Sequence, residues 1–459
     1  MDRLMIGVSG VRGTIGGTLT PRIACDFAAA FGTMLMENRR EPATLTLGRD
    51  TRPSGPMLRN AVAAGLMATG VRVIDLGVAS TPGCALMTRR LGADGGVIIT
   101  ASHNPGEYNG LKFLQSVGTG LTAAAAGRLK ELFESGAFVL TGSDSQGSES
   151  QNDDTHAAHV STLCEHYDAS RIAAGRFRVV LDSVNGAGCA VTPMLLERFG
   201  CRLTHINGEP TGRFAHPPEP VADNLGVLCR IVREGGADVG FAQDADADRL
   251  AIVDERGEFI GEEYTLALAT AYTLRHRTGP VATNLGTTRM IDDIARAAGC
   301  VVLRTPTGEA NVVEAMLAHE CVFGGEGGGG AIDPRVVPVR DSLVGIACVL
   351  SHVAESGRTI SQLVEELPRY HMLKTKLPCP ADAAGEVARR TKAAFQERTD
   401  AEFNEADGLR IDLPEGWVLA RPSNTEPILR VQAEAKERDQ ARKLLDRVLR
   451  IAREVVEAA

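Results

Sequence analysis

Three aspartates alternate with alanine in Asp244-Ala245-Asp246-Ala247-Asp248, and Arg249 follows them; we call residues 244–249 the acidic loop. Carboxylates this close repel one another unless a cation lies between them, and hard oxygen ligands favour Mg²⁺, Mn²⁺ or Ca²⁺. A calcium EF-hand is the competing interpretation, because Glu255 falls at its twelfth position. It is excluded because Arg249 stands at the sixth position, which needs glycine, and because the flanking segments are typical of strands. The acidic loop predicts a Mg²⁺ site, against the alternative of a solvated acidic turn.

A serine follows the apolar, β-branched segment 96–100 in Thr100-Ala101-Ser102-His103-Asn104-Pro105, the serine loop (100–105). The segment before it predicts a short buried strand, and Asn104-Pro105-Gly106 predicts a turn. Ser102 is therefore expected at the carboxyl end of a strand, where open α/β sheets bind ligands. His103 does not form a pair with Ser102 by adjacency alone, because neighbouring side chains in extended chain point to opposite sides.

Glycines surround one carboxylate, Glu326, in the glycine loop (325–330). The run satisfies the GxGxxG pattern, but a dinucleotide-binding loop should open a helix and residues 331–334 break the chain instead. Bare backbone around Glu326 favours hydrogen bonding to a polyhydroxylated ligand, and a flexible glycine turn is the alternative.

A fourth segment, Arg421-Pro422-Ser423-Asn424-Thr425-Glu426-Pro427, is the arginine loop (421–427). It combines a guanidinium, hydroxyls, an amide and turn N–H groups, which are the donors that a phosphate dianion requires, and Arg430 lies one strand away. An ordinary Ser/Asn turn is the alternative. The chain contains no Walker loop, which excludes a P-loop NTPase.

The elements that position these loops repeat along the chain. Apolar segments alternate with helical patterns in three successive rounds, and each round ends a comparable strand in the serine, acidic or glycine loop. Three loops at equivalent ends of three sheets are expected to meet at one cleft. From about Tyr370 the order changes to strand, helix, strands and a long terminal helix, which predicts a small α+β domain.

We therefore predict an α/β protein with three related mixed-sheet domains and a C-terminal α+β domain. The predicted boundaries are 1–150 with the serine loop, 151–252 with the acidic loop, 253–366 with the glycine loop and 367–459 with the arginine loop. Residues 141–155 hold almost nothing apolar, so they are expected to form a mobile loop or linker.

Composition restricts the function further. The formal charge of -9 argues against a nucleic-acid partner and means that an anionic substrate must be held by local cations. Ten cysteines without a CxxC pair are typical of a reducing compartment. The sequence shows no secretory segment and no apolar run of spanning length. We expect a cytoplasmic protein without a membrane or nucleic-acid partner.

Together the four loops supply a hydroxyl nucleophile, a divalent metal site, contacts for a sugar and a phosphate site, which are the parts that phosphoryl transfer needs. In this order the four motifs resemble the α-D-phosphohexomutase family along nearly the whole chain. The resemblance implies three related α/β domains and a TATA-box-binding-protein-like C-terminal domain around a central cleft. It also implies a phosphosugar substrate, with the protein as a monomer or homodimer.

The resemblance implies a mechanism as well. Ser102 is expected as phosphoserine that donates to the free hydroxyl of a hexose phosphate, through a bisphosphorylated sugar. One Mg²⁺ is expected on Ser102 and the three aspartates, with a sugar 1,6-bisphosphate as activator. The expected catalytic residues are Ser102, Lys112 as general acid/base, Arg12 in the N-terminal loop, and His103. The expected substrate-binding residues are Arg249, Gly308, Glu326, Gly328, Arg421, Ser423, Asn424, Thr425 and Arg430.

Two positions depart from the family pattern. Many members have Ser-Gly-His where Gly328-Gly329-Gly330 stand, so a histidine sometimes assigned to proton transfer is absent. Ala245 replaces a commoner glycine without removing a ligand. Residues 8–14 and 308–314 are most similar to phosphoglucosamine mutases, so glucosamine 6-phosphate is the expected substrate. Phosphomannomutase/phosphoglucomutase activity and, beyond it, a Mg²⁺-dependent sugar phosphatase or a catalytically silent sugar-phosphate sensor are the alternatives.

Overall fold

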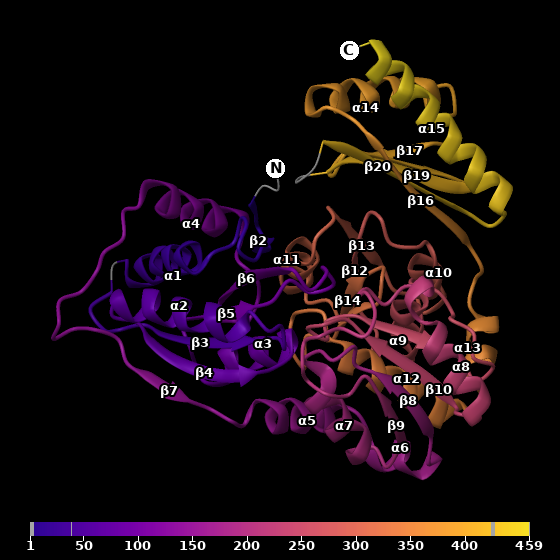
Figure 1. The fold of residues 1–459 in the computed structure, drawn as a ribbon. Helices are drawn as coiled ribbons and strands as arrows, with labels where there is room; N and C mark the ends of the chain where they lie inside the picture. The colour runs from indigo at the N-terminus through magenta and orange to yellow at the C-terminus, as the bar shows by residue number, and fades with distance from the viewer. Residues whose placement is uncertain (1–3, 38, 424–426, 459) are drawn as a thin grey trace.

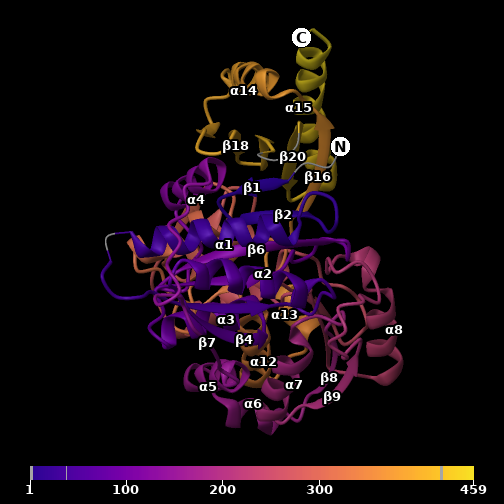
Figure 2. The same ribbon diagram turned by 60° about the vertical axis from the view of Figure 1, so that its left-hand side comes forward.

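A computed structural model describes residues 4–37, 39–423 and 427–458 of the chain. It contains four sheets, and we call each sheet with its helices a unit. Figure 1 shows the first unit beside the second and third, and in both views the fourth unit lies above the others (Figures 1 and 2). Within the part of the chain that is described, every helix is too short or too polar to cross a membrane.

The first unit has a seven-stranded sheet in the order β1-β2-β6-β5-β3-β4-β7. Strands β3, β4, β5 and β7 are parallel, whereas β1, β2 and β6 pair antiparallel, so the sheet is mixed. The strands are β1 (Met5–Gly7), β2 (Gly10–Thr14), β3 (Thr44–Arg49), β4 (Arg72–Val78), β5 (Gly95–Ile99), β6 (Tyr108–Gln115) and β7 (Glu149–Gln151). The helices are α1 (Pro21–Met36), α2 (Gly55–Ala68), α3 (Thr81–Arg90) and α4 (Ala123–Ser135).

Local sequence explains where these helices begin. Thr20 accepts a hydrogen bond from the Ile23 N–H, and Pro21 opens α1. Ser80 caps α3 and Thr122 caps α4 in the same way, and α4 ends at Gly136 with a φ of 65°.

The second unit has a sheet of order β11-β10-β8-β9, and the third has one of order β13-β12-β14-β15. The second contains α5 (Thr155–His166), α6 (Ala169–Gly175), β8 (Arg178–Asp182), α7 (Gly188–Arg198), β9 (Arg202–Ile206), η1 (Ala222–Asn224), α8 (Gly226–Gly235), β10 (Val239–Gln243) and β11 (Leu250–Val253). The third contains α9 (Tyr264–His276), β12 (Val281–Asn284), α10 (Met290–Ala297), β13 (Val302–Thr305), α11 (Glu309–Ala318), β14 (Phe323–Glu326), β15 (Gly330–Ile332), α12 (Ser342–Ser356) and α13 (Ile360–Glu366).

One strand pattern occurs in all three sheets. Strands β3, β8 and β12 each lie between two parallel neighbours, and one of these neighbours pairs antiparallel with the strand that follows it. The loops β5–β6, β10–β11 and β14–β15 are therefore equivalent, and they are the serine, acidic and glycine loops. The predicted architectural repeat is confirmed.

The fourth unit is an antiparallel sheet of order β16-β20-β19-β18-β17. Its two helices cover the face that points away from the third unit (Figure 1). The elements are β16 (His371–Pro378), α14 (Ala381–Phe395), β17 (Glu402–Asn404), β18 (Leu409–Leu413), β19 (Gly416–Pro422), β20 (Ile428–Ala435) and α15 (Arg438–Ala458). This arrangement confirms the predicted α+β class.

One local prediction was wrong, and another was incomplete. Residues 8–14 are not a free loop, because β1 and β2 form a hairpin there. The stretch 141–155 connects the first two units, as predicted for a linker, but it also contains β7. This edge strand pairs with β4 through its backbone and needs no apolar side chain to do so.

Apolar packing joins the first three units and separates the fourth. One cluster includes Leu86 of the first unit, Phe199 of the second and Leu268 of the third. The fourth unit has its own core, and a small cluster around Trp417 and Leu285 joins it to the third.

Candidate active site

The three aspartates of the acidic loop are buried, and one ligand oxygen from each lies within 4.8 Å of the others. One oxygen of Asp246 accepts from the Thr81 hydroxyl at 2.6 Å, and its Oδ1 has no hydrogen-bond partner among the described residues; the same holds for Oδ1 of Asp248. Burial, reinforced by the neighbouring carboxylates, raises the pKa of Asp244 well above its ordinary value. Two orphaned buried carboxylate oxygens beside a third carboxylate fit a divalent cation.

Ser102 lies at the end of β5 and points at the acidic loop. Its Oγ donates to Asp244 Oδ2 at 2.7 Å, while backbone N–H groups of Asp248 and Arg249 occupy Oδ1 of the same carboxylate. The backbone of Ser102 has a φ of 49°, and its N–H donates to Thr100 Oγ1. The serine loop and the acidic loop therefore meet at one point.

The side chain of His103 lies closer to that of Ser102 than is expected for neighbouring residues in extended chain. Its Nδ1 is 3.4 Å from Ser102 Oγ, because the positive φ of Ser102 turns the chain out of the extended form on which that argument rested. Burial, together with the cations Arg249 and Arg12, lowers the pKa of His103 to about 3, so its imidazole is neutral at pH 7.

Arg52, which the sequence analysis did not identify, holds the serine loop. Its side chain is 0% exposed and pairs with Asp50 at 3.1 Å. It donates to the carbonyl oxygens of Ser102, Asn104, Pro105 and Tyr108 at 2.8, 2.6, 2.6 and 2.9 Å. The sequence did contain a signal for Arg52. Asp50-Thr51-Arg52 directly follows β3, which is parallel to β5, so these residues are expected beside the serine loop.

Lys112 extends from β6 into the acidic loop. Its Nζ lies 2.6 Å from Asp246 Oδ2 and 3.3 Å from Asp248 Oδ2. Burial alone would lower the pKa of Lys112, but the two carboxylates outweigh it and raise the pKa above its ordinary value. Arg12 lies on β2 rather than in a loop, and it donates to Asn104 Oδ1 in the serine loop at 3.1 Å.

Glu326 of the glycine loop is held on both oxygens. Its Oε1 accepts from Asn284 Nδ2 at 2.7 Å and from the Gly308 N–H at 2.9 Å, and its Oε2 lies 3.1 Å from Arg340 Nη1. Gly308 has a φ of 123°, a region that disfavours other residues. Gly328 has a φ of 85°, and a Cβ there would meet nothing closer than Arg249 at 4.0 Å.

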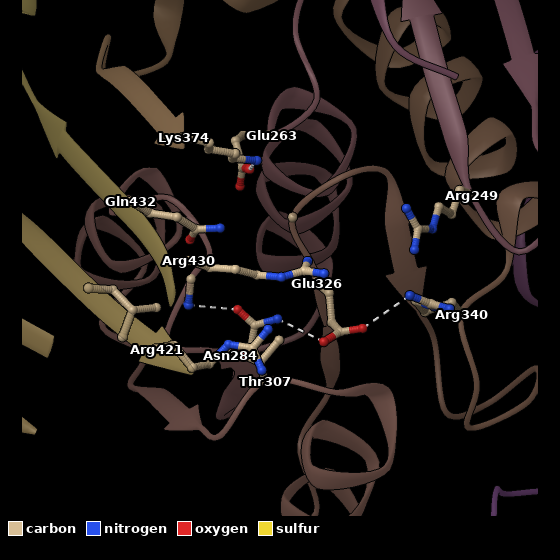
Figure 3. A pocket seen from close by; sticks show the side chains of 13 residues that line it. Arg249, Glu263, Asn284, Thr307, Glu326, Arg340, Lys374, Arg421, Arg430 and Gln432 are labelled. Carbon is tan, nitrogen blue, oxygen red and sulfur yellow. Dashed lines mark hydrogen bonds and ion pairs between the residues drawn. The ribbon is translucent and has the colours of Figure 1, made fainter. Parts of the chain in front are cut away.

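A pocket of about 180 Å³ opens beside Glu326 (Figure 3). Arg421 on β19 and Arg430 on β20 enter it from the fourth unit, and Arg249 and Arg340 line it from the opposite side (Figure 3). The N–H of Ser423 donates to the Ile428 carbonyl at 2.9 Å. The predicted residues Asn424 and Thr425 lie outside the described part of the chain.

The structure thus brings the predicted residues into two adjoining groups. Ser102, His103, Lys112 and the aspartates form one group. Glu326, Arg421 and Arg430 line the pocket, and Gly308 contacts Glu326 through its N–H. Arg340 and Arg249 lie between the groups. The residues that sequence reasoning missed are Arg52, Thr81, Asn284 and Arg340, whose parts depend on contacts distant in sequence.

Comparison with known proteins gives four matches in succession. Models of the phosphoglucomutase/phosphomannomutase α/β/α domains I, II and III match residues 3–139, 155–257 and 261–370, and the model of the C-terminal domain matches 375–451. A phosphoglucomutase/phosphomannomutase of Thermococcus kodakarensis is 39% identical over 98% of this chain and 99% of its own. A probable phosphoglucosamine mutase of Methanopyrus kandleri is 37% identical over 98% of each chain.

A solved structure agrees with these matches. The phosphoglucomutase/phosphomannomutase family protein of Burkholderia thailandensis superposes with a TM-score of 0.84 at 26% identity, over 99% of this chain and 98% of that one. The resemblance seen in the four sequence motifs is confirmed: the chain belongs to the phosphoglucomutase/phosphomannomutase family.

Proposed function

We propose that the protein interconverts hexose 6-phosphate and hexose 1-phosphate through a phosphoserine at Ser102 and a bisphosphorylated sugar. The observation that carries this proposal is the contact of Ser102 Oγ with Asp244, inside a trio of buried aspartates in which two oxygens accept no hydrogen bond from the described residues. A hydroxyl nucleophile, a cation site and Lys112 thus lie together beside a pocket of sugar size.

The residues at the acidic loop fit Mg²⁺, the predicted cofactor. Asp244, Asp246 and Asp248, with the oxygen of Ser102 or of its phosphoryl group, would hold the ion, which when bound neutralises negative charge on the phosphoryl oxygens. Each aspartate already has one oxygen fixed by protein donors, so the other oxygen is oriented before an ion arrives.

The chain's own residues account for the transfer. The phosphorus–oxygen bond to Ser102 breaks as a bond to the free sugar hydroxyl forms. The sugar hydroxyl loses its proton and the departing Ser102 oxygen gains one, so no net proton is taken up or released. Lys112 is the proposed general acid/base. The bisphosphorylated sugar then reorients, and its other phosphoryl group returns to Ser102. Arg12 and His103, which contact the serine loop or its Oγ, are proposed to position the reacting group.

The pocket provides the binding groups for the rest of the substrate. Glu326 and the backbone at Gly308 and Gly328 are proposed to contact sugar hydroxyls. The phosphate that does not react is proposed to bind the arginine loop; the predicted contacts there are Arg421, Ser423, Asn424, Thr425 and Arg430. Arg249 is proposed to balance charge near the acidic loop.

Glucosamine 6-phosphate remains the preferred substrate, and glucose and mannose 6-phosphates are the alternatives. The relatives include probable phosphoglucosamine mutases and a phosphoglucomutase/phosphomannomutase, so both assignments have support. The bisphosphate activator, a monomer or homodimer, a cytoplasmic location and domain boundaries near 150, 252 and 366 stay predictions. All ten cysteines are free, which favours a reducing compartment.

The test is a substrate panel. Purified protein receives Mg²⁺, a sugar 1,6-bisphosphate and one of the 6-phosphates of glucosamine, glucose or mannose, and 1-phosphate formation is followed. Fast turnover of glucosamine 6-phosphate alone supports the preferred substrate, and preference for another hexose replaces it within the same mechanism. Release of inorganic phosphate without any 1-phosphate would identify a phosphatase and overturn the proposal.

A further inference from the structure

Arg340 contacts three carboxylates that come from three separate loops. Its Nη2 lies 2.8 Å from Asp248 of the acidic loop, its Nη1 lies 3.1 Å from Glu326 of the glycine loop, and its Nε lies 2.8 Å from Glu309 at the start of α11. The side chain is 14% exposed and reaches these groups from the segment between β15 and α12. A planar guanidinium presents five N–H donors in fixed directions, so its three nitrogens can face three different carboxylates at once.

The bridge occupies one oxygen of Asp248 and one oxygen of Glu326, and the two carboxylates differ at their second oxygen. Asp248 uses Oδ2 for Arg340 and Lys112, and its Oδ1 has no hydrogen-bond partner among the described residues, with Arg249 Nε 3.9 Å away. Glu326 uses Oε2 for Arg340, while Oε1 accepts from Asn284 and Gly308 beside the pocket. One side chain therefore sets the orientation of a proposed metal ligand and of a proposed sugar ligand.

The path of Arg340 depends on Gly330. A Cβ at position 330 would lie 2.4 Å from Arg340 Cδ and 3.0 Å from its Cγ, which is closer than carbon atoms pack. The arginine cannot simply swing aside, because its guanidinium is held by three carboxylates. The stem of Arg340 therefore occupies the space that a side chain at position 330 would need.

We propose that Arg340 is a positioning residue that couples the acidic loop to the glycine loop, so that the cation and the sugar are held in one fixed relation to Ser102. Gly330 is the residue that makes this arrangement possible. The proposal rests on the proposed function for the identity of the two ligands. It assigns no proton transfer to Arg340, because a guanidinium keeps its charge in proteins.

Direct binding tests the coupling without turnover. Mg²⁺ alone, and hexose 6-phosphate without Mg²⁺, are titrated calorimetrically into unphosphorylated wild type, Arg340→Gln and Glu326→Gln. Arg340→Gln is expected to weaken Mg²⁺ binding about tenfold and sugar-phosphate binding about tenfold. Glu326→Gln is expected to weaken the sugar phosphate alone. The matched control is Arg277→Gln, which loses an arginine–aspartate pair with Asp333 in the same unit and is expected to change neither.

Two results would overturn the coupling. The first is an Arg340→Gln protein that binds either ligand within twofold of wild type. The second is an Arg340→Lys protein with wild-type binding and kcat/KM. A positive charge without the planar guanidinium would then be sufficient for binding and turnover. If instead wild type binds both ligands but forms no 1-phosphate, the proposed function fails while the binding result still decides the role of Arg340.

A double-mutant cycle tests the place of Gly330. Gly330→Ala is expected to reduce kcat/KM about as much as Arg340→Ala does, because the added methyl group displaces the arginine stem. In an Arg340→Ala background the same methyl group has room, so Gly330→Ala is expected to cost less than twofold there. Equal losses in both backgrounds would show that Gly330 acts independently of Arg340 and would overturn this part of the inference.

Discussion

Ser102 and the three aspartates rest on a hydrophobic core that the first three sheets share, whereas Arg421 and Arg430 belong to a sheet with a core of its own. We call the part of the site around Ser102 and the three aspartates the serine end. Buried groups there have several partners each, as the four carbonyl oxygens around Arg52 illustrate. At the arginine end, around Arg421 and Arg430, the fourth unit joins the third through a small apolar cluster and through polar contacts that include those of Arg289 and Lys374. The proposed nucleophile thus lies beside the core that three sheets share, and the proposed phosphate contacts lie on a unit with a core of its own.

The largest difference between the two ends is expected in catalysis. Ser102→Ala removes the proposed nucleophile, so kcat should fall by about four orders of magnitude or more. Arg421→Gln removes one proposed phosphate contact and should raise KM about tenfold with a smaller change in kcat. Initial rates of 1-phosphate formation and the incorporation of labelled phosphate into the protein measure both. Labelled phosphate on Ser102→Ala protein would show that another residue accepts the phosphoryl group.

The stability of the serine end is expected to depend on Arg52. Arg52→Met leaves Asp50 buried without its charge partner and four carbonyl oxygens without a donor, so unfolding free energy should fall by about 3–5 kcal/mol. Urea unfolding followed by circular dichroism measures the loss. Arg398→Met, which removes surface ion pairs with Asp400 and Glu415 in the fourth unit, is the control and should leave the midpoint unchanged. Equal urea midpoints for Arg52→Met and Arg398→Met would contradict the proposed dependence of the serine end on Arg52.

The junction of the two parts is expected to affect substrate binding more than chemistry. Trp417 is 0% exposed, packs with Leu285 and Leu419, and donates from Nε1 to Glu434 at 2.8 Å. Trp417→Ala should destabilise the fourth unit by about 3–5 kcal/mol and raise KM about tenfold, because the arginine loop loses its fixed distance from Ser102.

The control for this variant separates stability from position. Leu445 lies in the core of the fourth unit, and it belongs to a different cluster from Trp417. Leu445→Ala should destabilise the unit by about 2–5 kcal/mol while KM stays near the wild-type value at low temperature. A KM that rises equally in both variants would show that the junction has no separate part in binding.

The sequence was informative at the serine end for a physical reason. Polar residues that directly follow an apolar strand must lie at its carboxyl end, so the positions of Ser102, Asp244 and Glu326 follow from local pattern alone. The roles of Arg52 and Arg340 could not be predicted from local pattern, because each arginine contacts oxygen atoms that only the tertiary fold brings together. The contact of His103 with Ser102 depends on the positive φ of Ser102. A serine at that position does not predict a positive φ.

The smallest expected effect concerns pH and one ion pair of the second unit, which the proposed chemistry does not use. His216 Nε2 lies 3.0 Å from Asp182 Oδ2. Burial alone would lower the pKa of His216, but its hydrogen bond and attraction to Asp182 outweigh burial and raise the pKa. A raised folded-state pKa means that the protonated pair stabilises the fold below about pH 6.5 and that this contribution is lost as pH rises through the folded-state pKa.

Melting temperatures of wild type and His216→Gln between pH 6 and pH 9 measure this contribution. The gap between the two proteins should be widest at the acid end and should narrow as pH rises, because only the protonated imidazole gains from Asp182. The pKa of Asp182 itself is lowered by its hydrogen bonds with His216 and Asn207, although burial opposes them, so its own contribution is lost only at acid pH. A gap that does not change with pH would mean that His216 stabilises the fold through packing alone and that its pair with Asp182 makes no electrostatic contribution.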